Sequence, residues 1–256
     1  MKAPVAVPLY TLTKKEVVRI FRIWTQSLLP SVVTTSLYFL IFGAFIGSQV
    51  RDIGGVSYME FIVPGLVMMA IVTNSFMNVV SSFFGNKFQK SIEELLVSPT
   101  PNWVILLGYS MGGIVRGLAV GGLVLLIAYF FTQIQIMNPV LVITFAILTA
   151  LVFSFAGLLN GIFAKKFDHV SIVPTFVLTP LTYLGGVFYS IETLPEFWQN
   201  VSKVNPVLYM VDGFRFGFFG FSDVSVLTSF IILAVFVVIL GTLDIILLNR
   251  GVGLRT

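Results

Sequence analysis

The sequence predicts an all-α integral membrane protein with six transmembrane helices. Hydrophobic residues make up 57% of the 256-residue chain and charged residues only 10%, against about 25% charged in a soluble domain. A soluble fold of this composition would expose apolar patches far larger than a monomer tolerates, whereas lipid solvates such a surface. The apolar residues also form continuous runs, without the alternation that the strands of a membrane β-barrel require.

Each apolar run is long enough to cross the bilayer as a helix, which needs about 20 residues. The first run is too long for the apolar region of a cleaved signal peptide, which has about 7–15 residues. A polar turn that ends in proline (132–139) separates the third run from the fourth. The six predicted spans are 27–47, 61–85, 104–131, 140–163, 170–189 and 224–248. Little chain is left over, so we expect a single membrane domain over residues 1–256.

Ahead of the first span, residues 13–28 are predicted to form an amphipathic helix. Its apolar residues fall on one face and its basic residues on the other. The apolar face comprises Val17, Ile20, Phe21, Trp24 and Leu28. This pattern is typical of a helix that lies on the membrane surface with its basic side chains toward anionic headgroups. A simple topology anchor would have the same pattern.

One charged segment (87–101) stands between two long uncharged stretches, 61–86 and 102–115. It is predicted to form a short amphipathic helix that ends at Pro99 and Pro101. The residues of its apolar face are Phe88, Ile92, Leu95 and Leu96, and those directed away from it are Lys90, Glu93, Glu94 and Val97. Both a solvated loop helix and a docking surface for a partner in the aqueous phase fit this pattern.

Residues 192–223 are long for a structureless connection and too short for two crossings. The segment is rich in aromatic residues and prolines and poor in charge. We expect a re-entrant pair of helices that dips into the outer leaflet, with its non-helical backbone shielded by protein or water. Asp212 and Arg215 are three residues apart and are predicted to pair on one of these helices.

The distribution of basic residues predicts that both termini face the cytoplasm. Eleven lysines and arginines fall in segments assigned to one side of the membrane, and three fall on the other. The first group is Lys2, Lys14, Lys15, Arg19, Arg22, Lys87, Lys90, Lys165, Lys166, Arg250 and Arg255, and the second is Arg51, Lys203 and Arg215. The net charge of +4 therefore reports topology, and we expect no nucleic-acid partner.

The chain lacks the residue patterns of catalytic and metal sites. It has no cysteine, one histidine (His169) and no acidic cluster that could complete a metal site. Neither the G-x-S-x-G motif of hydrolases nor the G-x-x-x-x-G-K-[ST] motif of a phosphate-binding loop occurs. We therefore expect no enzyme activity, no metal and no cofactor in this chain.

The third span contains Arg116, which lies on the order of 18 Å along the helix from its start. An arginine at this depth either contacts a substrate or gating group, or serves as an internal hydrogen-bonded anchor. No carboxylate partner is evident, which argues against proton coupling. Glycines in the same span follow the G-x-x-x-G spacing of close helix packing, within or between subunits. They include Gly108, Gly112, Gly113, Gly117 and Gly121.

Two spans each carry a stripe of small polar residues on one helical face. The stripe in the second span is Asn74, Asn78, Ser81 and Gly85, and the stripe in the fifth is Ser171, Thr175, Thr179 and Thr182. Hydrogen bonds between packed helices would explain either stripe alone. Two stripes together favour a shared polar seam. The candidate residues of a translocation path are therefore Asn74, Asn78, Ser81, Ser171, Thr175, Thr179, Thr182 and Arg116.

Several motifs follow one another along the chain. Pro64-Gly65-Leu66 opens the second span, and the segments 85–99 and 174–190 follow it. Leu194-Pro195, Asn205-Pro206 and Asp212-Gly213-Phe214-Arg215 continue the series. Together these motifs resemble those of the ABC-2 type permease family, and the likeness covers essentially the whole chain.

The resemblance implies a type V exporter-like half-transporter in the bacterial inner membrane, which forms a homodimer. Each subunit would engage a separate ATP-binding subunit that holds the ATP and Mg, in keeping with the missing phosphate-binding loop. Residues 13–28 would be the cytoplasmic interface helix, 87–101 the coupling helix and 192–223 the outer re-entrant segment. The coupling residues would be Lys87, Phe88, Gln89, Lys90, Ser91, Ile92, Glu93, Glu94, Leu95 and Leu96. The path would run between subunits along the first, second and fifth spans.

The sequence thus favours the membrane subunit of an ATP-driven exporter. The abundance of phenylalanine (26 residues) and the uncharged polar stripes favour an amphiphilic substrate, such as a lipid, a drug, a glycolipid or a polysaccharide. One alternative is an ion-coupled secondary transporter that acts without an ATPase partner. Another is an intramembrane enzyme, which the missing catalytic groups argue against.

Overall fold

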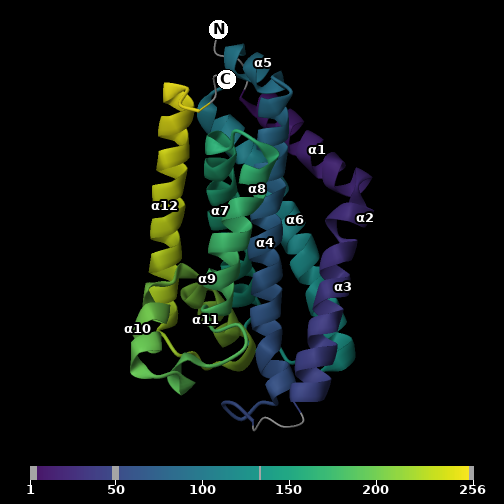
Figure 1. Ribbon diagram of the computed structural model, residues 1–256, viewed down its shortest axis with the longest axis vertical. Coiled ribbons are helices and arrows are strands. Elements are labelled where there is room, and N and C mark those ends of the chain that lie inside the picture. The colour runs from purple at the N-terminus through teal and green to yellow at the C-terminus, as the bar shows by residue number, and fades with distance from the viewer. Residues whose placement is uncertain (1–4, 48–51, 133, 254–256) are drawn as a thin grey trace.

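The computed structural model describes residues 5–47, 52–132 and 134–253, and helices dominate these ranges (Figure 1). In chain order the elements are α1 (Ala6–Arg22), α2 (Trp24–Ser27), α3 (Leu29–Tyr38), the π-helix η1 (Phe39–Ile46), α4 (Tyr58–Phe88), α5 (Ser91–Val97), α6 (Asn102–Phe131), α7 (Pro139–Phe163), α8 (Phe167–Val173), the π-helix η2 (Pro174–Leu178), α9 (Thr179–Tyr183), the 3-10 helix η3 (Ile191–Thr193), α10 (Glu196–Val204), α11 (Pro206–Phe219) and α12 (Val226–Arg250). The prediction of an all-α chain is confirmed for these residues.

Within the described ranges, five helices are long and apolar enough to cross a membrane. They are Trp24–Gly43, Tyr58–Phe88, Asn102–Phe131, Pro139–Phe163 and Val226–Arg250. These correspond to the first four predicted spans and the last. The predicted interfacial helix (13–28) is α1, which starts earlier and ends at Arg22, so Trp24 already belongs to the first span.

The fifth predicted span (170–189) is built differently. It consists of α8, η2 and α9 in succession, and the last of these ends at Tyr183. Pro174 and Pro180 remove two backbone donors from this helix, and a π turn begins at Pro174. Gly186 then takes a left-handed φ of 73°, which turns the chain away. The helical part is shorter than the five spans, and a crossing by this segment stays a prediction.

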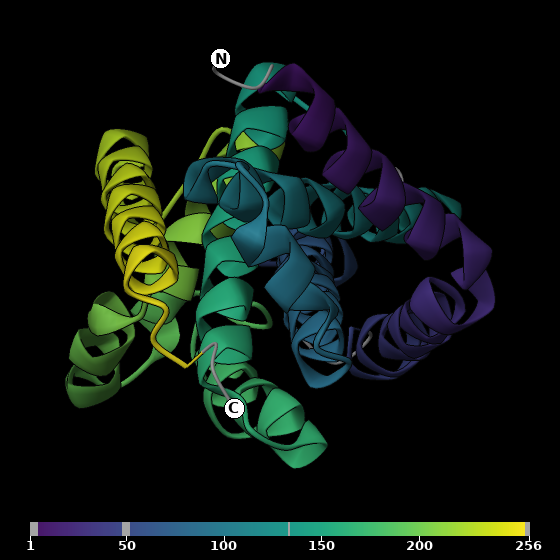
Figure 2. The same ribbon diagram turned by 90° about the horizontal axis from the view of Figure 1, so that it is seen from above.

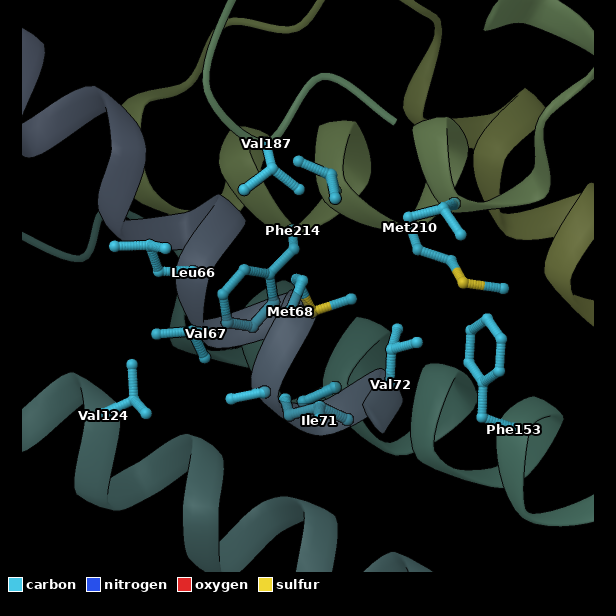
Figure 3. Close-up of a cluster of buried hydrophobic side chains, with 14 of the residues drawn as sticks. Leu66, Val67, Met68, Ile71, Val72, Val124, Phe153, Val187, Met210 and Phe214 are labelled. Atoms are coloured by element: carbon cyan, nitrogen blue, oxygen red, sulfur yellow. The ribbon is translucent and has the colours of Figure 1, made fainter. Parts of the chain in front are cut away.

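α4 is the central helix and packs against α6 and α7 along its length (Figures 1 and 2). Figure 3 shows Met68 and Ile71 of α4 in one apolar cluster with Val124 of α6, Phe153 of α7 and Phe214 of α11. Because protein surrounds α4 on most sides, buried amides such as those of Asn74 and Asn78 have hydrogen-bond partners inside the subunit.

The glycines of α6 contact helices of the same subunit. A Cβ atom on Gly108 would lie 2.7 Å from the Cβ of Leu12, and one on Gly112 would lie 2.7 Å from the Cβ of Glu16. α1 therefore rests directly on the α6 backbone at two successive turns. On a second face of α6, the glycines at 117 and 121 make the same kind of close approach to α4. The G-x-x-x-G spacing thus serves packing within the subunit.

The two ends of the bundle carry different elements (Figure 1). α5, the start of α1 and the end of α12 lie together at what we call the α5 end, and α10 and the turn at 52–57 lie at the opposite end. Lys90 and Arg250 lie at the α5 end and Lys203 at the opposite end, which is the separation that the basic residues predict. Which end faces the cytoplasm stays a prediction. Three residues used in that prediction, Lys2, Arg51 and Arg255, lie outside the described residues.

The segment predicted to be re-entrant (192–223) forms a helical pair, α10 and α11, and α11 packs against α7 and α12. Its immersion in the outer leaflet stays a prediction. The expected Asp212–Arg215 pair is wrong, because each side chain has other partners. The Asp212 carboxylate accepts hydrogen bonds from the backbone N–H groups of residues 223 and 224, at 2.9 and 2.7 Å. Arg215 donates to the Gly186 carbonyl oxygen at 2.5 Å, and its guanidinium carbon lies 4.1 Å from the centre of the Phe61 ring.

Candidate functional site

The charged segment forms a short exposed helix that is set off from α4 by a sharp turn. Lys90 has a left-handed φ of 60°, and α5 begins at the next residue. Ile92 is 1% exposed and anchors α5 to the bundle, with Leu95 and Leu96 half-buried beside it. The exposed residues of this turn and helix are Gln89, Lys90, Ser91, Glu93, Glu94 and Val97. α5 therefore presents an acidic, hydroxyl-bearing surface at the end of the bundle.

Phe88 does not share the buried face of α5, contrary to the prediction. The turn at Lys90 ends the helical register, so Phe88 is the last residue of α4 and is 60% exposed. Its ring lies against Phe84, at 6.1 Å, and against Phe167 at the start of α8, at 4.8 Å between ring centres. Phe88 joins an aromatic group on α4 and α8 and is still available at the surface.

Lys87 was predicted to contact a partner, but its side chain is only 5% exposed. Its Nζ donates to the carbonyl oxygens of Ile162 and Ala164, at 2.6 and 2.7 Å. Ile162 lies in the last turn of α7 and Ala164 directly follows the helix, where carbonyl oxygens lack helical partners. A lysine that caps a helix C-terminus in this way also interacts favourably with the helix dipole. Lys87 therefore holds α4 to α7, and its ammonium group is not part of the exposed surface.

Asn86 connects four helices just before the charged segment. Its Oδ1 accepts from Lys15 Nζ of α1 and from Ser91 Oγ of α5, both at 3.2 Å. Its Nδ2 donates to the Tyr109 hydroxyl of α6 at 2.9 Å and to the Ser82 carbonyl of α4 at 3.0 Å. One amide of α4 thus ties α5 to α1 and α6.

A cleft with a mixed polar and apolar lining opens beside this junction, between α1, α5 and the start of α6. Its volume is about 450 Å³. Lys15 and Glu94 line it together with the hydroxyls of Thr11, Ser98 and Thr100. Apolar residues of both helices, Val7, Pro8 and Leu12 of α1 and Leu95 of α5, complete the lining, so the cleft between α1 and α5 is amphipathic.

The polar stripe of α4 is divided between the interior and the surface. Asn78 is fully buried, and Arg19 of α1 donates to its Oδ1 at 2.9 Å. Asn74 is 5% exposed and its Nδ2 donates to Ser31 Oγ of α3 at 3.1 Å. Ser81 is exposed, and its hydroxyl donates to the Met77 carbonyl oxygen. Asn78 is therefore a structural residue of this subunit, and the prediction that it faces a seam is corrected.

Arg116 is an internal anchor. Its Nη2 donates to the Ser27 carbonyl oxygen at 3.1 Å, and Ser27 is the last residue of α2. This carbonyl lies where the chain bends from α1 and α2 into α3, at a helix end that lacks internal partners. Of the two interpretations of Arg116, this contact favours the hydrogen-bonded anchor.

The second polar stripe is mostly exposed. Ser171, Thr175 and Thr179 lie on the outer face of α8, η2 and α9, whereas Thr182 is 2% exposed. The hydroxyls at 171, 179 and 182 donate to carbonyl oxygens of their own helix. Ile172, Phe176 and Val177 are exposed among them, so this face is amphipathic. The structure does not join this stripe to Asn74 and Asn78, which lie beneath α1 and α3.

A groove does lie between α3 and α4. It encloses about 210 Å³ and is lined by hydroxyl and amide groups of Ser31, Thr34, Thr73 and Asn74, with apolar residues such as Met69 between them. α9 reaches the same region, where the hydroxyls of Tyr38 and Tyr183 lie 3.2 Å apart. The groove is thus amphipathic and is lined by the first and second predicted spans, with the fifth in contact with it only through Tyr183.

Three residues of this site were missed by the sequence patterns: Glu16, Asn86 and Tyr109. Glu16 is 1% exposed although it lies on a helix predicted to face headgroups. The sequence offered one signal of this contact: Glu16 stands three residues before Arg19, and the two side chains form a 2.9 Å ion pair. Among the described residues, no group of three or more His, Cys, Asp or Glu side chains could hold a metal ion.

Comparison with known proteins decides the family. The family model described as ABC-2 type transporter matches residues 8–219. The chain belongs to this family. The chain is 56% identical to the inner membrane transport permease YadH of Escherichia coli (strain K12), over 98% of both proteins. It is 25% identical to nodulation protein J of Rhizobium leguminosarum bv. trifolii, over 88% of this chain and 86% of the relative. The resemblance that the motifs indicated is confirmed.

Family membership assigns the long apolar helices to a membrane transporter. The chain is a transport permease with several membrane-spanning helices, and a permease of this family normally pairs with a separate ATP-binding subunit. The relative from E. coli is named as an inner membrane protein, which fits a multi-pass chain of this composition.

Proposed function

We propose that this chain is the membrane subunit of an ATP-driven exporter, that two copies form the membrane channel, and that each copy binds an ATP-binding subunit through α5. The observation that carries the proposal is the construction of α5. It is a short exposed helix with two acidic residues at its tip, held from below by buried Ile92. The buried side of α5 joins the helix to the bundle, and its exposed acidic side is accessible to a partner in the aqueous phase.

The proposed path runs along the α3–α4 groove and the exposed stripe of α8, η2 and α9, with a second copy of the chain closing the other side. Thr175 and Thr179 supply exposed hydroxyls, and the groove adds those of Ser31, Thr34 and Thr73. Hydroxyls interspersed with apolar side chains suit an amphiphile, such as a lipid, a drug, a glycolipid or a polysaccharide, better than an inorganic ion. We place the protein in the bacterial inner membrane with both termini in the cytoplasm.

An ion-coupled carrier is the second candidate, and one observation favours it. Asp244 of α12 is fully buried, and neither carboxylate oxygen has a hydrogen-bond partner among the described residues. Acidic residues buried within membrane helices often belong to ion pathways.

Copurification with the ATP-binding subunit, whose gene we expect beside this one, tests the proposal. Glu93→Lys with Glu94→Lys should weaken the complex at least tenfold, about 1.4 kcal/mol, because a docking surface loses its electrostatic match. The control is Lys166→Glu, a charge reversal at an exposed residue of the loop before α8. Substrate export that persists without any ATPase and collapses with the proton gradient would overturn the proposal in favour of the carrier.

A further inference from the structure

The end of α6 that lies away from α5 carries an apolar pocket on its outer side (Figure 1). The pocket encloses about 700 Å³, a volume within the range of small-molecule sites. One face of α6 forms its floor, because the lining residues follow the i, i+3, i+4, i+7 spacing of a single helical face. These residues are Gly122, Leu125, Leu126 and Tyr129. Leu126 is 55% exposed and Tyr129 is 72% exposed, so the described helices leave this face uncovered.

Gly122 makes room for this pocket. Its neighbour Gly121 packs against α4, where an added Cβ would lie 2.7 Å from Ile71 Cγ1. A Cβ added at Gly122 would instead meet no neighbouring atom within 4 Å. A glycine inside a helix lowers the stability of that helix, and Gly122 is not needed for packing within the subunit. Its missing side chain leaves space beside α6 for another molecule.

The apolar pocket continues into a polar space just past the end of α6. This second space encloses about 630 Å³ and shares Tyr129, Phe130 and Ile134 with the first. Thr132 and Gln135 add their polar groups to its lining. The side-chain amide of Gln135 is exposed and makes none of the hydrogen bonds among the described residues. An apolar space beside the span thus opens into a polar one where the span ends.

Backbone donors lie at the polar rim. Residues 134–136 belong to no helix, and their N–H groups donate to no other described residue. The next two N–H groups, of Met137 and Asn138, donate to the carbonyl oxygens of Phe218 and Gly217 in α11, at 3.3 and 2.8 Å. These two bonds hold the rim in place. Non-helical backbone at the edge of the hydrocarbon needs partners from water or from another molecule, so the donors at 134–136 favour an acceptor such as a phosphate group.

We propose that this pocket binds one phospholipid with a zwitterionic headgroup, in the leaflet on the side opposite α5. The acyl chain would lie along the Gly122–Tyr129 face of α6, and the phosphate would accept from the N–H groups of residues 134–136. The site needs neither an ATPase nor export, so it stands apart from the proposed function.

Three observations select this occupant. α6 is one of the long apolar helices of a membrane transporter, so hydrocarbon surrounds its outer face. The order of the two spaces along α6, apolar and then polar, is the order of acyl chain and headgroup in a leaflet. None of the residues that line the two spaces is charged. Anionic lipids are typically held by clusters of Lys and Arg, so this lining favours a headgroup without net charge.

Native mass spectrometry of the detergent-purified chain, titrated with phosphatidylethanolamine, tests the proposal. Gly122→Leu puts a side chain into the pocket and should weaken binding about tenfold, which corresponds to two displaced CH₂ groups of the acyl chain. Gly85→Leu is the matched control, because this glycine of α4 also has no atom within 4 Å of an added Cβ. It should bind the lipid as the unaltered chain does. Unchanged binding by Gly122→Leu, or an equal loss in both variants, would overturn the proposal.

Two further variants keep the test decisive. If Gly122→Leu does not accumulate, Leu126→Trp fills the same pocket from the next turn of α6 and is judged by the same criterion. Gln135→Ala removes the amide at the rim and should weaken phosphatidylethanolamine binding by about two- to fivefold, the effect of one hydrogen bond. Tighter binding of the anionic lipid phosphatidylglycerol than of phosphatidylethanolamine by the unaltered chain would refute the zwitterionic headgroup.

A second copy of the chain is the other molecule that could cover this face. Because the chain has no cysteine, Leu126→Cys provides a single reactive site in the pocket. In membranes it should react with a lipid-soluble maleimide and should form no disulfide with a second copy under oxidation. A disulfide-linked dimer through this position would show that a second subunit closes the pocket, and the lipid site would be refuted.

Discussion

Lys87 offers a sharp test of whether a residue of the charged segment supports the fold or contacts a partner. Its Nζ donates to two carbonyl oxygens at the end of α7, those of Ile162 and Ala164. Lys87→Met keeps most of the length of the side chain and removes the charged donor. Both carbonyls then lose this partner in a region that is closed to water, since Lys87 itself is only 5% exposed.

The size of the effect follows from these two contacts. A buried polar group left unsatisfied costs about 1–3 kcal/mol, so two carbonyls cost about 2–6 kcal/mol. Methionine recovers part of this, because an ammonium group no longer has to be desolvated. We expect a net loss of about 3 kcal/mol, which lowers Tm by about 6–12 °C in a chain of this size.

Thermal unfolding of the detergent-purified chain, followed by the fluorescence of its three tryptophans, measures this change. Lys90→Met is the matched control, because Lys90 is exposed and donates none of the described side-chain hydrogen bonds. The Tm of this variant should change by less than about 2 °C, since substitutions at exposed positions usually have small effects on stability. ATPase copurification is scored for both variants. The reasoning is refuted if Lys87→Met keeps the Tm of the unaltered chain and loses the ATPase, since that result would make Lys87 a docking residue.

Three further predictions concern topology, helix packing and the path. Single cysteines at Ser91 and Lys203 should react with an impermeant thiol reagent from opposite sides of the membrane. Ser91→Cys should react only after the cells are opened. Labelling of Ser91→Cys in intact cells would show that the predicted topology is the wrong way round. Gly112→Ala should destabilise the chain by about 1–3 kcal/mol, because the added Cβ would lie 2.7 Å from the Cβ of Glu16. In the same unfolding assay Gly122→Ala should be neutral or slightly stabilising, because its Cβ would meet no neighbouring atom within 4 Å. Thr179→Leu should reduce or redirect export without changing Tm; normal export of every substrate tested would remove this stripe from the path.

Asn78 and Ser81 were both candidates for the substrate path, because they lie on the same face of one helix in the sequence. In the structure they differ: Asn78 is buried and accepts a hydrogen bond from Arg19, whereas Ser81 is exposed. Helical spacing tells which residues lie on one side of a helix within about one turn. It does not tell which of those residues a neighbouring helix covers and which stay exposed.

Hydropathy was sufficient for five of the six predicted spans but not for 170–189, which the structure divides among α8, η2 and α9. Long apolar runs predict helices because each backbone polar group in lipid must bond within its own helix. The charged segment and its two prolines predicted a separate short helix, and α5 is that helix. The motifs along the chain were sufficient for the family, because they cover its whole length.

Only the packed subunit decided what the long polar side chains do. Lys87 and Glu16 lie in segments that the sequence assigns to water or headgroups, yet both are buried against helices far away in the chain. A lysine or glutamate can reach several ångströms from its helix, so its partner depends on the helix that packs beside it. The same holds for Gly108 and Gly112, whose spacing predicts a close contact but not that the contact is with α1. Local pattern specifies which face of a helix can be buried, and tertiary packing specifies against what.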